Sequence, residues 1–267
     1  MLKRVFSKQN RVLLAELVRT DFKLRYQDSV LGYIWSLLRP LLIFVILYVV
    51  FVKFLKVGDG VPYYAQYLLF GIVVWNFFVE MTMQSLGSVV GRGDLIRKIS
   101  IPRWIIVLST SLAALINLGL NLIIILIFIL IGHVPITGSV VLVPFYLLEI
   151  YIFALGVSFF LSAAFVKYRD ISYIWEVFLQ AGFYITPILY PLSKITNVLF
   201  QKIILLNPIA QALQDARYAM ITKVTTIPQT VFKGGWYEYI PFMIVVLVFF
   251  GGSAYFKKQS KHFAEDI

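Results

Sequence analysis

An uncharged run of 45 residues constrains this chain more than any other feature of its sequence. Residues 104–148 contain no Asp, Glu, Lys or Arg. As a single helix the run would be roughly 68 Å long at about 1.5 Å per residue, about twice what is needed to cross a bilayer. The helix-breaking stretch Gly132-His133-Val134-Pro135 lies inside it. The run is therefore predicted to fold back on itself as two membrane-spanning helices.

The composition and the other apolar runs extend this prediction to the whole chain. Hydrophobic residues make up 60% of it and charged residues 14%, against about 25% charged residues in a typical soluble domain. We expect one domain over 1–267, an all-α integral membrane protein with a membrane part at 33–256 and a tail at 257–267. Its six transmembrane helices are predicted at 33–54, 64–90, 104–131, 140–166, 171–190 and 239–256.

The distribution of basic residues predicts how these spans are oriented. If both chain ends and the loops 91–103 and 167–170 share one side, that side holds 17 of the 24 Lys and Arg residues. Because basic loops stay in the cytoplasm, both termini are expected there and the chain is expected in the cytoplasmic (inner) membrane. This asymmetry explains the net charge of +11 better than nucleic-acid binding does. Residues 1–10 contain no apolar stretch, so no cleaved signal peptide is expected.

A short amphipathic helix is expected before the first span, within 8–28. Charged Glu16 and Arg19 fall on one helical face, and the opposite face is apolar, with Leu13, Leu14, Leu17 and Val18. This pattern predicts an interface helix that lies on the cytoplasmic membrane surface.

The segment 192–238, between the fifth and sixth spans, is too long for a tight turn. It contains two apolar pieces, 195–206 and 209–221, separated by Asn207-Pro208. Each piece is too short to cross a bilayer. We therefore expect short re-entrant helices on the external side.

The cytoplasmic loop 91–103 mixes charges with apolar residues that a solvated loop does not need, namely Leu95, Ile96, Ile99 and Ile101. A short helix that docks into a partner protein uses such an apolar anchor with a charged rim. The alternative is that these residues pack back onto the membrane surface. The loop thus becomes a candidate partner contact.

The residue types needed for catalysis or cofactor binding are missing or scattered. There is no cysteine and no G-x-x-x-x-G-K-[ST] phosphate loop, and His133 and His262 have no metal-binding neighbours at a useful spacing. No nucleophile, base and orienting group form a recognisable pattern. The chain is therefore predicted not to be an enzyme and to bind no cofactor or metal, so a separate protein would have to supply any energy.

Polar residues within the predicted spans are the next candidates for function, because they are costly in lipid. They are Arg39, Glu80, Asn117, Asn121, Glu149 and Glu176. For Glu80 two interpretations stay open, a gating role facing a pore or a contact between helices. Asn117 and Asn121 are four residues apart and are expected to bond to a neighbouring helix. Arg39 is expected to reach the headgroups, and the last two carboxylates to pair with nearby bases.

Several motifs occur together along the chain: Asp21-Phe-Lys-Leu-Arg25-Tyr26, Leu31-Gly32-x-x-Trp35-x-x-Leu38-x-Pro40, Gly71-Ile-Val-Val-Trp75-Asn-Phe77-Phe78-x-Glu80, Leu95-Ile96-Arg97-Lys98 before Pro102, Tyr168-Arg169-Asp170-Ile171, Thr186-Pro187-Ile188-x-Tyr190 and Asn207-Pro208. Each is weak alone, but the ordered set covers nearly the whole chain. It resembles the membrane subunit of type-2 ABC exporters, specifically the polysaccharide-export permeases. That group moves lipid-linked O-antigen, capsule-type glycans or wall teichoic acid.

This resemblance implies a homodimer bound to two separate ATP-hydrolysing subunits, which would hold ATP and Mg²⁺. The segment Leu95-Ile96-Arg97-Lys98 resembles the family's coupling segment, and Arg169 and Asp170 resemble a second ATPase contact in which they pair with each other. The cargo, a lipid-linked glycan, would pass through a channel between two copies, lined by spans one, two and five. Aromatic and acidic residues on or beside these spans are the channel and gating candidates: Tyr33, Trp35, Trp75, Phe78, Glu80, Tyr184 and Tyr190.

Three other functions are alternatives to glycan export. A type-2 permease for a drug or small hydrophobic molecule is the nearest, but the stretch from Arg25-Tyr26 to Leu31-Gly32 and the short external loop 132–139 favour a glycan. An ion-driven transporter would show inverted repeats with ionisable residues at the membrane midplane, and neither is evident. An intramembrane enzyme would need the catalytic cluster that is missing.

Overall fold

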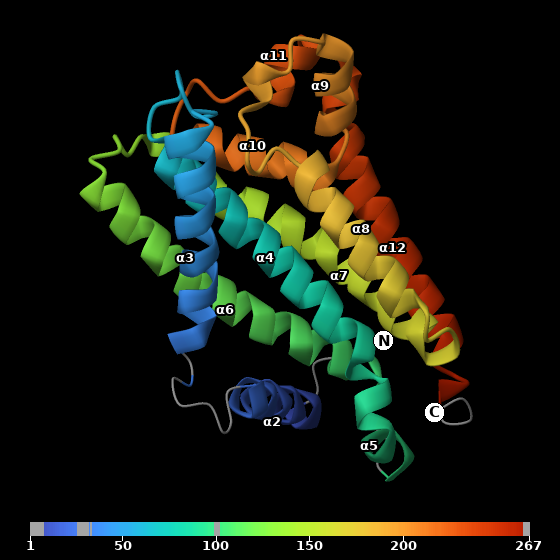
Figure 1. The fold of residues 1–267 in the computed structure, drawn as a ribbon. Coiled ribbons are helices and arrows are strands. Elements are labelled where there is room, and N and C mark those ends of the chain that lie inside the picture. The colour runs from blue at the N-terminus through green and yellow to red at the C-terminus, as the bar shows by residue number, and fades with distance from the viewer. Residues whose placement is uncertain (1–7, 26–31, 33, 99–101, 264–267) are drawn as a thin grey trace.

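The computed structural model describes residues 8–25, 32, 34–98 and 102–263, and the regular elements in this part of the chain are all helices (Figure 1). The predicted channel residue Tyr33 and the loop residues Ile99 and Ile101 lie outside the described residues. The predicted all-helical fold is thus confirmed for the described part.

Five helices of the described part are long and apolar enough to cross a membrane. Their bounds are α3 (Ile34–Tyr48), which continues as the π-helix η1 (Val49–Phe54), α4 (Tyr64–Ser88), α6 (Trp104–Ile131), α7 (Val143–Lys167) after η3 (Gly138–Leu142), and α12 (Ile240–Gln259) after η5 (Trp236–Tyr239). The long uncharged run folds back as predicted: α6 ends at Ile131, and His133 takes a positive φ of 52° in the turn that follows.

The predicted fifth span, 171–190, is a shorter helix than expected. Helix α8 (Ile171–Ile185) has 15 residues, so it measures about 22 Å at about 1.5 Å per residue. It ends early because Thr186 precedes Pro187, and the residue before a proline is driven out of the helical region; Thr186 has φ −71° and ψ 133°. Even so, α8 runs most of the way through the bundle, toward α10 (Figure 1).

Short helices lie at the two ends of the bundle (Figure 1). One end carries α2 (Lys8–Arg25), η2 (Val90–Arg92) and α5 (Gly93–Lys98), and the other carries η4 (Leu192–Lys194), α9 (Val198–Leu205), α10 (Pro208–Met220) and α11 (Pro228–Phe232). The two expected helices around Asn207-Pro208 are present, and the Asn207 side chain caps the second by accepting from the Ile209 amide at 3.0 Å. The five-residue α11 was not predicted.

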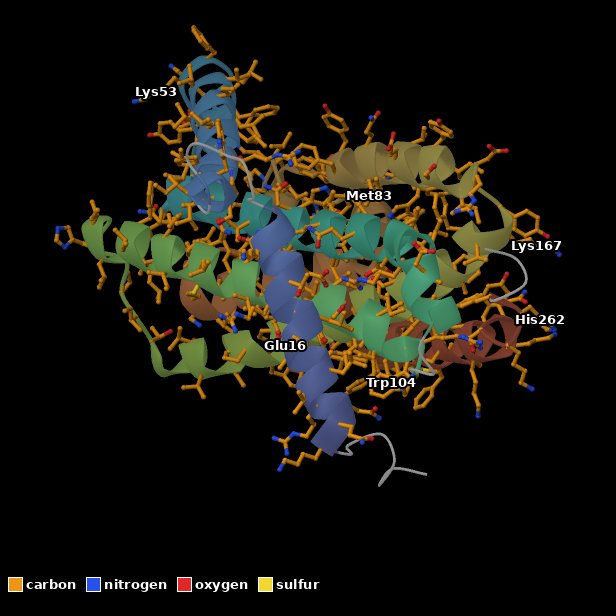
Figure 2. The ribbon with its side chains drawn as sticks, turned by 90° about the horizontal axis from the view of Figure 1, so that it is seen from below. Glu16, Lys53, Met83, Trp104, Lys167 and His262 are labelled. Carbon is orange, nitrogen blue, oxygen red and sulfur yellow. The ribbon has the colours of Figure 1, made fainter. Side chains whose placement is uncertain are left out.

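Helix α2 crosses the end of the bundle, as seen in Figure 2, and packs on α6. Its predicted apolar residues Leu13, Leu14, Leu17 and Val18 are half-buried, whereas Glu16 and Arg19 are exposed. The expected two faces of the interface helix are therefore present, and the apolar face covers the other helices.

Helix α4 is the centre of the fold. In its most apolar stretch 72% of the residues are buried, against 39% or less in the other four long helices. It packs against α3, α6, α7, α8 and α10. Other helices of the same chain therefore cover most of its surface.

Helices α7 and α12 cross closely at two glycines, Gly156 and Gly252. A Cβ atom placed on Gly156 would lie 2.6 Å from the Phe249 Cα, and one placed on Gly252 would collide with the Gly156 carbonyl oxygen. Small residues allow two backbones to approach in this way, which is how membrane helices commonly pack.

Candidate functional site

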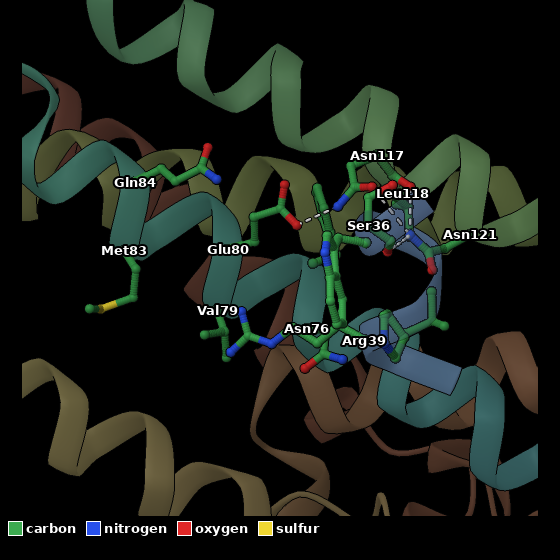
Figure 3. Close-up of a pocket in the computed structure, with 14 residues that line it drawn as sticks. Ser36, Arg39, Asn76, Val79, Glu80, Met83, Gln84, Asn117, Leu118 and Asn121 are labelled. Atoms are coloured by element: carbon green, nitrogen blue, oxygen red, sulfur yellow. Dashed lines mark hydrogen bonds between the residues drawn. The ribbon is translucent and has the colours of Figure 1, made fainter. Parts of the chain in front are cut away.

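A polar cavity of about 470 Å³ lies between α3, α4 and α6 (Figure 3). Charged and amide side chains are costly in lipid, yet each of these three helices places at least one such side chain in the cavity wall. They are Arg39, Asn76, Glu80, Gln84, Asn117 and Asn121, with Trp35 at the same wall. The helices therefore bring together residues that lie up to 86 positions apart.

Hydrogen bonds connect the polar residues of the cavity across the helices. The Asn117 amide donates to Glu80 Oε2 at 2.6 Å, and the Asn121 amide donates to the Ser36 carbonyl at 3.4 Å (Figure 3). The predicted bonds from these two asparagines to neighbouring helices are confirmed. Glu80 both contacts a second helix and lines the cavity, so the two interpretations of this residue are compatible. Arg39 is exposed and also lines the cavity.

Two of the predicted channel aromatics are buried inside the chain instead. Trp75 is 6% exposed and lies against Gly182 of α8, and Phe78 is 3% exposed between Phe153 and Trp175. Their rings fasten α4 to α7 and α8. Burial of this extent leaves no surface for cargo in the conformation described, so their place in a channel stays a prediction.

Two more of the predicted channel aromatics, Tyr184 and Tyr190, lie at the α10 end of α8. Tyr184 is 67% exposed. The Tyr190 hydroxyl donates to the carbonyls of Tyr184 at 3.2 Å and Ile185 at 3.0 Å. Tyr190 therefore caps the last turn of α8, whereas the Tyr184 ring packs edge-on against Phe183 and stays largely exposed beside the helix.

Arg217 on α10 is a fully buried cation that sequence reasoning missed. Its guanidinium donates to the carbonyls of Tyr67 at 2.9 and 3.1 Å, Ile188 at 3.1 Å and Pro187 at 2.5 Å, and its carbon lies 3.6 Å from the centre of the Tyr67 ring. Gly71 leaves the space that the guanidinium fills. The side chain thus ties α10, α4 and the chain beyond α8 together.

The expectation that Glu149 pairs with a base is wrong. Glu149 is buried in α7, and neither carboxylate oxygen has a hydrogen-bond partner in the described part of the chain. Asp215 of α10 repels it electrostatically. Burial raises the pKa of the Asp215 carboxyl to about 7.

The predicted coupling segment forms a helix, α5 (Gly93–Lys98). Leu95, Arg97 and Lys98 lie on it. Ile96 is partly buried and packs against the chain's own hydrophobic core. Docking onto a partner therefore remains a prediction for the rest of α5, while Ile96 also has a structural role.

The predicted pair Arg169–Asp170 is wrong. Both residues are exposed in the turn before α8, and the Arg169 guanidinium lies over the Phe165 ring, 5.1 Å from its centre. Phe165 is one helical turn before Arg169, within reach of its long side chain. The turn is therefore braced by stacking and not by an ion pair, and its contact with an ATPase remains a prediction.

A polar network at the α2 end joins three helical elements, and sequence reasoning missed it. Arg92 of η2 forms an ion pair with Asp21 of α2. The Ser109 hydroxyl of α6 donates to the other Asp21 oxygen at 3.0 Å and accepts from Arg92 at 3.2 Å. Both charged side chains are less than one-fifth exposed. Displacement of η2 and α5 would therefore pull on α2 and α6 at once.

Comparison with known proteins identifies relatives along nearly the whole chain. A sequence model described as "ABC-2 type transporter" matches residues 12–221, from α2 to the end of α10. A protein of Klebsiella pneumoniae named "O-antigen export system permease protein RfbA" is 29% identical over 256 residues, 95% of this chain and 94% of that protein. A protein of the same name from Myxococcus xanthus is 28% identical over 268 residues, 97% and 96% of the two chains. The matched region includes the cavity, the Asp21–Arg92 network and Arg217.

Proposed function

This chain belongs to the ABC-2 type transporter family, and we propose that it is the permease subunit of an ATP-driven exporter of lipid-linked O-antigen polysaccharide. The observation that carries the proposal is its similarity, over more than nine-tenths of both chains, to two proteins named as O-antigen export permeases. The polar cavity supports it, because a permease for a small apolar molecule would have no use for four carboxamides at membrane depth.

In this proposal the chain crosses the inner membrane six times with both ends in the cytoplasm. Helix α8 is the fifth crossing, lengthened by the unwound segment up to Tyr190, where Arg217 satisfies the carbonyls that a helix would have bonded internally. Helices α9, α10 and α11 then lie on the external side as re-entrant elements. The basic α2 and α5 end of the bundle supports this orientation.

A second copy of the chain completes the channel. Helix α8 carries apolar residues that are each more than half exposed in the single chain: Tyr173, Ile174, Val177, Phe178, Tyr184 and Ile185. A stripe of this kind suits a partner helix or a channel wall as well as lipid. Tyr184 and Trp35 are the predicted channel aromatics with exposed rings, and we assign cargo contact to these two.

The chain itself binds no cofactor in this proposal; two partner ATPases hold ATP and Mg²⁺. Helix α5 docks into the ATPase, and the turn at Arg169 and Asp170 forms a second contact. Motion of α5 reaches α2 and α6 through Arg92 and Asp21. Hydrolysis in the partner thereby moves helices that line the polar cavity.

Leu95→Asp is expected to prevent copurification of the ATPase while membrane insertion of the chain stays intact, because a charge replaces the apolar anchor of α5. Leu55→Asp is the matched control, since Leu55 is 59% exposed beyond η1, at the opposite end of α3 from α2. Ile96→Asp should reduce the yield of folded chain as well, because Ile96 packs on the core. An unchanged complex with Leu95→Asp would contradict the docking role.

Asp21→Asn is expected to uncouple hydrolysis from transport. Loss of one partner in a partly buried ionic network costs about 1–3 kcal/mol, enough to release α2 from η2 without unfolding the chain. Glycan moved per ATP hydrolysed should fall severalfold while the complex still forms. Glu16→Gln on the exposed face of α2 removes the same charge and should behave as wild type. Equal coupling ratios in all three proteins would refute the transmission role.

Reconstitution tests the function itself. The chain is copurified with its ATPase, placed in lipid vesicles and given lipid-linked glycan on the ATPase side. We expect the glycan to become accessible inside the vesicles only when ATP is hydrolysed. Movement driven by an ion gradient without an ATPase would favour a secondary transporter, and ATP-driven movement of small apolar dyes but not glycan would favour a drug permease.

A further inference from the structure

A second polar cavity, of about 390 Å³, adjoins the first at the α2 end of the molecule. It lies between α2, α4 and α6, and its wall includes Asp21, Gln84, Gly87, Gly91 and Arg92. Gln84 also lines the first cavity (Figure 3). The two cavities therefore meet at the Gln84 side chain, and both lie along the same face of α4.

Together the cavities follow α4 through much of the membrane. From Asn76 in the first cavity to Ser88 in the second, α4 rises about 18 Å along its own inclined axis at about 1.5 Å per residue, whereas a hydrocarbon core is about 30 Å thick. One end lies beneath the interface helix α2, and the other lies deep among the spans. The space beside Gly87 and Gly91 at the α2 end is open, because a Cβ at either position would meet no atom within 4 Å.

The charges along this path balance. Arg39 and Glu80 carry opposite charges in the first cavity, and Arg92 is paired with Asp21 in the second. A phosphate would call for an excess of cations. The remaining polar groups are the carboxamides of Asn76, Gln84, Asn117 and Asn121, and those of Asn117 and Asn121 also bond to Glu80 and Ser36. Such a set suits a neutral molecule rich in hydroxyl groups, and the indole ring of Trp35, 44% exposed, offers a flat surface to the C–H face of a sugar.

We propose that the two cavities form one polar track within each chain, which carries the sugar end of the cargo from the cytoplasmic surface to the middle of the membrane. The inference rests on the proposed function. It differs from the channel between two copies, because the track is walled by α6 and not by α8. The lipid carrier stays outside the track, along the exposed apolar face of α3.

The absence of native cysteine makes this track directly measurable. Single cysteines are introduced as Gln84→Cys and Gly87→Cys, with Ile127→Cys on the exposed apolar face of α6 as control. The complex with its ATPase, in inside-out vesicles, is treated with a charged methanethiosulfonate that cannot cross the membrane. We expect both track cysteines to react at least about tenfold faster than the control, because only a hydrated thiol ionises to the reactive thiolate.

Preloading with lipid-linked glycan should slow labelling of Gln84→Cys severalfold, whereas the same lipid diphosphate without sugars should not. No labelling at either track position would overturn the inference. Labelling that the glycan does not slow would overturn it too. ATP-driven glycan export, assayed on the same vesicles, shows separately whether the proposed function fails or stands. If Gln84→Cys fails to fold, Gly87→Cys keeps the test decisive, because Gly87 has open space around it.

Discussion

Arg217→Met is expected to abolish export and to leave little folded chain in the membrane. Methionine fills a similar volume but cannot donate to the carbonyls of Pro187 and Ile188, which follow the last turn of α8. A buried acceptor left without a donor costs about 1–3 kcal/mol, so two of them remove much of the stability of a marginally stable protein. The Pro187 end of α8 would then separate from α4 and α10.

Yield and thermal unfolding of the detergent-purified chain measure this effect. Lys223→Met is the matched control: it removes the same charge from an exposed side chain shortly after α10. Arg217→Lys should be intermediate, because one ammonium group reaches fewer of the carbonyls than a planar guanidinium. Export and a melting temperature at wild-type levels in Arg217→Met would show that the buried cation is dispensable.

Gly252→Leu is expected to prevent assembly of the bundle. A side chain there meets the backbone of α7 at Gly156, and a backbone atom cannot move aside by changing rotamer. Overpacking of ordinary side chains costs about 1–3 kcal/mol, and a collision with backbone lies at or beyond the upper end of that range. Since α7 and α12 are extensively packed together, their separation should expose the chain to proteolysis.

Gly251→Leu is a closely matched control, because it makes the same change one residue earlier on the same helix, where a Cβ meets no atom within 4 Å. Limited proteolysis in membranes distinguishes the two variants. We expect Gly251→Leu to resist protease like the wild type and Gly252→Leu to be degraded. Equal resistance would mean that α7 and α12 do not cross at these glycines.

The sequence predicted those features that depend on local pattern. The uncharged run predicted the bounds of α6. The helical spacing of the apolar residues in 12–20 predicted the apolar face of α2, and Asn207-Pro208 predicted the start of α10. Arg39, Glu80, Asn117 and Asn121 were singled out as polar residues within spans, but the cavity that they line was not predicted, because the pattern does not say which helices face one another.

Features that depend on distant contacts were missed. The bond between Asp21 and Arg92 spans 71 positions, and that between Arg217 and Tyr67 spans 150. In the sequence, Arg217 is one of several basic residues predicted on the external side. Its neighbours in the alanine-rich helix α10 do not indicate that its side chain is buried. Glu149 was given a basic partner because buried carboxylates normally have one, and the fold supplies none in the described residues.

Depletion of this chain in its own cells, with glycan synthesis left running, tests export most directly. The quantity to measure is the distribution of the lipid-linked polymer between the cytoplasmic face of the membrane and the cell surface. Export by this chain predicts that polymer disappears from the surface and accumulates inside, and that restoring the wild-type chain, but not Arg217→Met, reverses both changes. Normal surface polysaccharide after complete depletion would contradict it.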